Sequence, residues 1–202
     1  MPTDECLPNA RHGERIYPWE MSEQDPLLQA HLRRYHHACE SITTRDTVVD
    51  AACGSGYGSA LLAKRAAWVI GIDDYGDALV DAQTHYQDQR SLWFVQADLD
   101  QCILPACDVL VSLETVEHLR QPERFIQQVR ACARREIILS TPIIPTVGKN
   151  PFHRSDFTLD QVRSWFTTDE WIVVQEWLQE DAAVDFGPVY AVVRARRRLC
   201  CQ

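Results

Sequence analysis

Short apolar runs alternate with helix-like segments along the middle of the chain, and this alternation limits the fold more than any other feature of the sequence. The apolar runs have the length and composition of buried strands. We predict five strands, at residues 47–52, 68–72, 92–96, 108–113 and 136–140. We predict helices at residues 58–65, 77–87 and 123–134. Strands that alternate with helices form a parallel sheet with helices on both faces, so the chain is predicted to be an α/β protein.

The two ends of the chain add further predicted elements. Residues 1–45 are predicted to form an N-terminal arm and a helix, and residues 141–157 a long loop with three prolines. A loop of this length in a compact domain is usually functional or disordered. A helix from Thr158 to about Phe166 and two strands, at 171–177 and 189–196, close the chain, and the strands are expected to pair as an antiparallel hairpin. The length of 202 residues fits one domain, 1–202.

Composition argues against several functions. The net charge is −9, so no general attraction to nucleic acid is expected. The one basic run, at residues 194–198, is interpreted as a solvated edge strand or tail. No apolar stretch is long enough to span a membrane, and the N-terminus lacks the pattern of a secretory signal, which favours a cytoplasmic protein. None of the eight cysteines forms a Cys-x-x-Cys pair, so no structural zinc site is predicted.

A Gly-rich segment after the first predicted strand is the strongest functional signal. Residues 48–58 read Val-Val-Asp-Ala-Ala-Cys-Gly-Ser-Gly-Tyr-Gly and run from a strand through a turn into a helix. Glycines in such a turn let the backbone approach a ligand and adopt positive φ angles. Asp73, at the end of the second strand, is suited to binding ribose hydroxyls. Asp98 follows the third strand and could accept from an adenine amine, so these strand ends predict a nucleoside pocket.

A nicotinamide-dependent enzyme is the alternative that such a turn raises. The turn of those enzymes usually reads Gly-x-Gly-x-x-Gly. Residues 54–58 read Gly-Ser-Gly-Tyr-Gly and do not provide the third glycine at that spacing. The sequence also has no recognisable group of residues for hydride transfer, so we favour a different nucleoside-containing cofactor.

The motif spacing resembles that of class I methyltransferases dependent on S-adenosylmethionine (SAM). Their first motif is an acid, any residue, Gly, Cys, Gly, a small residue and Gly. Ala52 replaces the first of these glycines, and we expect a slightly shifted turn rather than a lost site. The resemblance implies a Rossmann-like fold with a mostly parallel seven-stranded sheet and a C-terminal antiparallel hairpin. The SAM-binding residues that it implies are Asp50, Ala52, Cys53, Gly54, Gly56, Asp73, Asp74, Asp98, Leu99 and Glu114.

Further segments resemble a bacterial subfamily associated with glycan, lipopolysaccharide and natural-product sugar biosynthesis. The segments lie at residues 13–18, 31–35, 113–119, 140–142 and 150–157. This resemblance implies a small-molecule substrate, preferably a sugar or a nucleotide sugar. A protein or nucleic-acid substrate is disfavoured by the net charge and by the absence of an Asn/Asp-Pro-Pro-Tyr type of motif.

Glu114 and His118 are the first candidates for catalysis, because they follow the fourth predicted strand, where the transferred methyl group would point. A helical turn there would place both side chains on one face, since they are four residues apart. A hydroxyl acceptor needs a base, and histidine titrates near neutral pH. We predict that His118 is the base and that Glu114 orients it or binds the substrate. The structural alternative is that the two residues order and pack the local turn.

His153, in the loop at residues 141–157, is the second candidate. This loop could close over the substrate; alternatively, it only leads into the next helix, with Asp156 and Thr158 as capping residues. A metal site made of His118, His153 and an acid is a less favoured alternative. No tight metal-ligand spacing supports it, so no metal is predicted.

Arg15 and Tyr17 lie in the predicted N-terminal arm. An arm ahead of the first strand can fold across the cofactor edge, where either side chain could hold the methionine carboxylate of SAM. The alternative is a structural brace. The sequence as a whole predicts an enzyme that methylates an O or N atom of a small molecule. A SAM-binding partner or regulatory subunit without catalysis is the alternative from another class.

Overall fold

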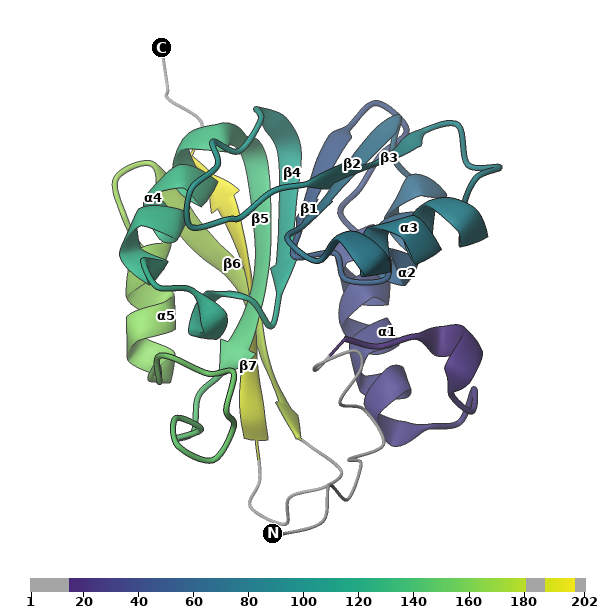
Figure 1. Cartoon of the computed structure of the whole chain (residues 1–202). Helices are drawn as coiled ribbons and strands as arrows, with labels where there is room; N and C mark the ends of the chain where they lie inside the picture. The colour runs from purple at the N-terminus through teal and green to yellow at the C-terminus, as the bar shows by residue number, and fades with distance from the viewer. Residues whose placement is uncertain (1–14, 181–187, 199–202) are drawn as a thin grey trace, which may run out of the picture.

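A computed structural model of the chain describes residues 15–180 and 188–198, and in them one seven-stranded sheet carries helices on both faces (Figure 1). The strands are β1 (Thr47–Ala51), β2 (Trp68–Asp73), β3 (Leu92–Gln96), β4 (Cys107–Leu113), β5 (Ala133–Pro142), β6 (Trp171–Glu180) and β7 (Pro188–Arg197). The helices are η1 (Pro18–Glu20), α1 (Pro26–Cys39), α2 (Tyr57–Ala63), α3 (Gly76–His85), η2 (Val116–His118), α4 (Pro122–Cys132) and α5 (Leu159–Trp165).

The sheet has the strand order β3-β2-β1-β4-β5-β7-β6. Strands β1 to β5 pair in parallel, whereas β7 runs antiparallel to both β5 and β6. This arrangement confirms the predicted Rossmann-like sheet with a C-terminal antiparallel hairpin. Because the carboxyl ends of parallel strands meet at one edge, the segments that follow β1 to β5 are brought together there.

Alternate residues of the central strands pack on opposite faces of the sheet. Val48 and Ile138 join the core beneath α1 and α2, whereas Val49 and Ile137 join the core beneath α4 and α5. Figure 1 shows the same division, with α3 on the side of α1 and α2. Because both faces are covered, these strands are continuously apolar, which is why they were recognisable in the sequence.

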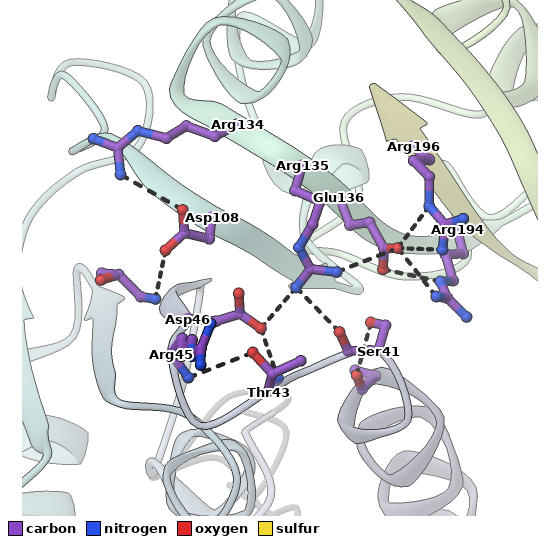
Figure 2. Close-up of polar contacts among 12 residues, drawn as sticks. Ser41, Thr43, Arg45, Asp46, Asp108, Arg134, Arg135, Glu136, Arg194 and Arg196 are labelled. Carbon is purple, nitrogen blue, oxygen red and sulfur yellow. Dashed lines mark hydrogen bonds and ion pairs between the residues drawn. The ribbon is translucent and has the colours of Figure 1, made fainter. Parts of the chain in front are cut away.

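The last strand departs from the sequence interpretation of a solvated edge or tail, which was wrong. β7 lies inside the sheet, between β5 and β6. Arg194 Nε and Arg196 Nη2 lie 3.0 and 2.7 Å from the carboxylate oxygens of Glu136 on β5, which is completely buried (Figure 2). The arginines serve as partners of a buried charge, which explains why they occupy a strand that is paired on both sides.

The helices of the described residues are short. The longest helix, α1, has 14 residues, and no helix in the described ranges has the length and apolar character that a membrane crossing needs.

Candidate active site

The turn after β1 carries the Gly-rich segment to the carboxyl edge of the sheet. Cys53 N donates to the carbonyl oxygen of Ile72 at 3.0 Å, which ties the turn to β2. Gly54 and Gly56 have positive φ angles of 55° and 79°. A Cβ on Gly56 would lie 2.5 Å from the ring of Phe94, whereas a Cβ on Gly54 would meet nothing closer than 3.8 Å. Gly56 is therefore needed for packing, and Gly54 leaves the backbone open on one side.

The Asp73 carboxylate, at the end of β2, is nearly buried and accepts hydrogen bonds from three residues. Its Oδ1 accepts from Arg15 Nη2 at 2.8 Å and from Tyr75 N at 3.0 Å, and its Oδ2 accepts from Gly54 N at 2.8 Å. Arg15 also lies 2.8 Å from Asp74 Oδ1. The predicted ribose acid is thus held in place by the turn, and Arg15 lies against it.

The N-terminal arm reaches the cofactor edge and is fixed there by buried contacts. Ser55 Oγ donates to the carbonyl oxygen of Ile16 at 2.5 Å. Tyr17 is buried, and its ring meets that of Trp19 edge to face at 5.5 Å. Burial raises the pKa of the Tyr17 phenol to about 12. Tyr17 therefore braces the arm with a neutral side chain.

Asp98 follows β3 and organises a tight turn. Its Oδ1 accepts from Asp100 N at 2.8 Å, and its Oδ2 accepts from Gln101 Nε2 at 2.6 Å. Leu99 places its side chain in the core beneath α4 and α5. Any contact of Leu99 with a nucleoside would therefore come from its backbone.

Asp50 lies beneath the Gly-rich turn and is completely buried. It accepts hydrogen bonds from Ser59 Oγ at 2.6 Å and from Tyr35 OH at 3.3 Å, so it links β1 to α1 and α2. Burial raises the pKa of Asp50 to about 7. Its side chain supports the turn from below instead of lining an open surface.

Glu114 follows β4 and has a positive φ of 52°. Its Oε1 accepts from Ser140 Oγ at 2.7 Å and lies 3.7 Å from Arg34 Nη1. Glu114 and Thr115 lie outside η2, so no helical turn joins Glu114 to His118, and the predicted shared helical face is wrong. The reason is that the chain turns sharply at Glu114 before its short helix begins.

Arg34 is a residue of this site that the sequence analysis included in a motif but gave no role. It comes from α1, is 1% exposed, and lies 4.9 Å above the ring of Tyr190. Its Nε and Nη1 have no hydrogen-bond partner among the described residues. A buried guanidinium with donors that lack a hydrogen bond is suited to binding an anion, because buried donors left without an acceptor cost stability.

Glu117 is the second residue that lies in a motif of the sequence, at residues 113–119, but was given no role there. It is 1% exposed, and its Oε2 accepts from Thr141 Oγ1 at 3.0 Å. Burial and the nearby Glu114 raise the pKa of the Glu117 carboxyl well above its usual range. The backbone carbonyl of Glu117 accepts from Arg154 N at 2.8 Å, which ties the loop after β5 to η2.

His118 and His153, two of the predicted catalytic residues, are brought together although they lie far apart in the sequence. Their ring centroids are 4.6 Å apart, and the rings meet edge to face. One ligand atom of each imidazole and a carboxylate oxygen of Glu117 lie within 4.8 Å of one another. The site therefore has two groups of side chains: Glu114 with Arg34, and Glu117 with the two histidines.

A cavity of about 330 Å³ adjoins the first of these groups. It lies between the start of α1 and the neighbouring ends of β6 and β7, and Arg34, Glu180 and Tyr190 are among its lining residues. This volume is at the lower end of the range that is usual for small-molecule sites.

Comparison with known proteins supplies the chemistry that this architecture serves elsewhere. Residues 49–139 match the family model described as a methyltransferase domain. A probable S-adenosylmethionine-dependent methyltransferase of Mycobacterium tuberculosis H37Rv is 30% identical over 162 residues, which cover 75% of this chain and 57% of the relative. A ubiquinone biosynthesis O-methyltransferase of Leptothrix cholodnii is 29% identical over 151 residues, 70% of this chain and 63% of the relative. The chain thus spans less than two thirds of each.

Solved structures with the same fold extend the comparison. Magnesium protoporphyrin IX methyltransferase from Synechocystis, with bound S-adenosylhomocysteine (SAH), superposes with a TM-score of 0.71 at 19% identity and covers 93% of this chain and 91% of its own. The N-methyltransferase NodS from Bradyrhizobium japonicum gives a TM-score of 0.69 at 12% identity, over 89% of this chain and 100% of its own. These likenesses show that the sheet and its helices form the Rossmann-like methyltransferase fold.

Proposed function

We propose that the chain is a class I S-adenosylmethionine-dependent methyltransferase, as its matches indicate, and that it methylates a hydroxyl oxygen of a small molecule. The observation that carries the proposal is the meeting of His118 and His153 beyond the carboxyl end of β4. A hydroxyl group must lose its proton during methyl transfer, and imidazoles are suited to controlling that step near neutral pH. An amine acceptor, the alternative, needs only a neutral lone pair and positioning.

The residues at the strand ends fit SAM. The open backbone at Gly54 supports close approach of a ligand, and Asp73 offers a carboxylate for the ribose hydroxyls. Asp98 and Leu99 are assigned to the adenine side. When bound, SAM supplies a methyl group that is already activated on a sulfonium. The work left to this chain is to position the acceptor and to control its proton.

We assign the methionine carboxylate of SAM to Arg34 in place of Arg15 or Tyr17. Arg34 has two buried donors without a hydrogen-bond partner among the described residues, and its ion pair with Glu114 spans 3.7 Å. Arg15, by contrast, lies 2.8 Å from both Asp73 and Asp74. Arginine forms strong, charge-assisted hydrogen bonds to carboxylates, and the Nε and Nη1 of Arg34 are donors that could make one. Arg15 is then a brace for the ribose acid.

Two observations bear on the chemical class of the methyl acceptor. The motifs that resemble sugar-biosynthesis methyltransferases support a sugar or a sugar-bearing metabolite. The ubiquinone biosynthesis O-methyltransferases among the relatives support an oxygen atom of a ubiquinone-related compound. Both classes offer a hydroxyl oxygen, and the cavity lined by Arg34 and Tyr190 has the volume for a small molecule.

The test is transfer of a labelled methyl group from SAM to a panel of sugars, nucleotide sugars and phenols with neighbouring hydroxyls. With the accepted compound, His118→Ala should lower turnover by about 10²–10⁴-fold, the usual contribution of general acid–base catalysis. The affinity for SAM should stay near that of the unaltered chain, because SAM is assigned to other strand ends. The exposed His36 offers a control, and His36→Ala should leave turnover unchanged.

The outcomes separate the alternatives. Near-normal turnover in His118→Ala, with turnover abolished in His153→Ala, would assign proton control to the loop after β5. Normal turnover in both variants would contradict a hydroxyl acceptor and favour an amine. Tight SAM binding with no transfer to any acceptor would favour the SAM-binding partner without catalysis.

A further inference from the structure

A cluster of three side chains lies beyond the carboxyl ends of β4 and β5 and consists of Glu117, His118 and His153. The methyl-transfer proposal uses the two histidines but gives Glu117 no role. A carboxylate oxygen of Glu117 and one ring nitrogen of each histidine lie within 4.8 Å of one another. Two of these side chains come from η2, and the third comes from the loop after β5. The backbone bond from Arg154 N to the Glu117 carbonyl, at 2.8 Å, holds these two segments together.

The Glu117 carboxylate is only half engaged. Thr141 Oγ1 donates to Oε2 at 3.0 Å, whereas Oε1 is buried and has no hydrogen-bond partner among the described residues. The side chain is 1% exposed, so bulk water does not satisfy it. A buried carboxylate oxygen without a donor is costly, and a bound cation removes that cost.

Both histidines are oriented by a contact through Nδ1. His118 Nδ1 lies 3.2 Å from the carbonyl oxygen of Phe152, which can only accept, so this nitrogen carries the hydrogen. His153 Nδ1 lies 2.7 Å from Thr146 Oγ1, and the Thr146 hydroxyl donates to Asp156 Oδ1 at 3.1 Å. Thr146 therefore accepts from His153. A neutral imidazole held in this way carries its lone pair on Nε2, as metal-binding histidines commonly do.

We propose that Glu117, His118 and His153 bind one divalent first-row transition-metal ion. A carboxylate and two imidazoles are a donor set that suits Zn²⁺ and its neighbours, whereas Mg²⁺ prefers oxygen ligands alone. Three protein ligands leave at least one coordination position open for another oxygen. The sequence spacing gave no reason to predict this site, because its third ligand comes from a separate loop.

The role of the ion rests on the proposed methyl transfer. The open position would take the acceptor hydroxyl and lower its pKa, so that its proton is released to a solvent base. The oxygen then forms the new bond to the methyl carbon, and the methyl–sulfur bond breaks with its electron pair left on sulfur. In this account His118 and His153 control the proton as ligands of the ion, and neither has to accept it.

The test is a metal titration of the full chain. The chain carries Cys200→Ser and Cys201→Ser, so that this pair of adjacent cysteines does not compete for the metal ion. A chelator first removes any bound metal. Co²⁺ is added and followed by its visible absorption, and Zn²⁺ is then used to displace it. We expect one ion per chain. We also expect Glu117→Gln, His118→Ala and His153→Gln each to weaken binding by more than the roughly 10–100-fold cost of losing an outer-shell partner.

Controls keep the result interpretable. His36→Ala removes an exposed histidine outside the cluster and should leave the affinity unchanged. Thermal unfolding with and without Zn²⁺ shows whether each variant is folded, and His153→Gln, in the loop, is the least disruptive of the three. The proposed site is contradicted if the unaltered chain binds no ion below millimolar concentration. It is also contradicted if all three variants bind the ion as tightly as the unaltered chain.

The failure of this inference and the failure of methyl transfer give different results. SAM affinity is measured in parallel and should be the same with and without the ion. Full methyl transfer in the presence of a chelator would overturn the ion's role and leave the proposed function standing. Binding of the ion at the three residues without transfer to any acceptor would support the site and contradict the proposed activity.

Discussion

Ala52 and Glu114 adopt backbone conformations that L-amino acids rarely have. Their φ angles are 66° and 52°, in the left-handed region. A residue with a Cβ pays about 1–2 kcal/mol there, and such strain persists only where the surroundings fix the backbone. Both residues directly follow strands at the carboxyl edge of the sheet, so the strain lies at the proposed cofactor and acceptor sites.

Ala52→Gly should keep SAM binding and should not reduce stability. Glycine adds freedom to the unfolded chain, which by itself would cause a small loss of stability. The left-handed φ of Ala52 reverses the sign, since relief of about 1–2 kcal/mol outweighs an entropic cost of about 0.5–1 kcal/mol. Urea unfolding should show a gain of up to about 1.5 kcal/mol, the largest difference between these two effects.

The control for this substitution is Ala51→Gly, one position earlier. Ala51 is buried within β1 and does not have a positive φ, so its replacement by glycine should destabilise the chain. A loss of stability in Ala52→Gly as large as that in Ala51→Gly would show that the turn is not strained.

Some single residues could be assigned from the sequence and others could not. Asp73 was recognisable because an acid after the second strand has a fixed relation to the Gly-rich turn, and the two are joined through Gly54 N. Arg34 and Glu117 were not recognisable as special, because their signal is burial without a full set of partners. Burial of a charged side chain depends on tertiary packing, which local sequence does not encode.

At the scale of elements, β7 shows that a sequence pattern can predict a strand without predicting its place in the sheet. The alternation of apolar residues identified the strand, yet its arginines made it look like a solvent-exposed edge. It lies between β5 and β6, where the buried Glu136 of β5 accepts from Arg194 and Arg196 (Figure 2). The partner of a strand is set by contacts between distant segments, so the order of the last two strands needed the structure.

A double-mutant cycle should measure this link between β5 and β7. Arg194→Met alone leaves the buried Glu136 with fewer partners and should destabilise the chain strongly. Adding Glu136→Gln should recover part of the loss, with a coupling energy of about 0.5–3 kcal/mol in urea unfolding. The more exposed pair Arg163 and Glu176 is the comparison and should couple more weakly. Equal coupling in the two pairs would contradict a special role for Glu136.

At the scale of the whole molecule, the site is assembled from segments that are far apart along the chain. The sequence predicted the parallel sheet, and with it that the segments after β1 to β4 share an edge, because apolar runs of strand length are a strong local signal. It also selected His118 and His153. It did not predict that they touch, because that contact depends on how the loop after β5 folds back onto η2.

The stability of the whole chain should depend on pH because of the buried Asp50. Its folded pKa of about 7 lies above the value of about 4 for an unfolded chain. Between these values the folded state keeps a proton that the unfolded state releases, so this group's contribution to stability falls as pH rises, by about 1.4 kcal/mol for each pH unit. Asp50→Asn cannot titrate, so its stability relative to the parent should rise from pH 4 to 7 and then level off. Parallel stability curves in urea unfolding would contradict this.

We infer that this chain binds SAM at the carboxyl edge of its sheet, with Asp73 on the ribose. Calorimetric titration with SAM tests it most directly, using the unaltered chain, Asp73→Ala and, as a control, the neighbouring exposed Asp74→Ala. We predict one SAM per unaltered chain, a loss of about 1–3 kcal/mol of binding free energy in Asp73→Ala, as for hydrogen bonds to a charged group, and a smaller loss in Asp74→Ala. No binding to the unaltered chain, or unchanged affinity in Asp73→Ala, would contradict the account.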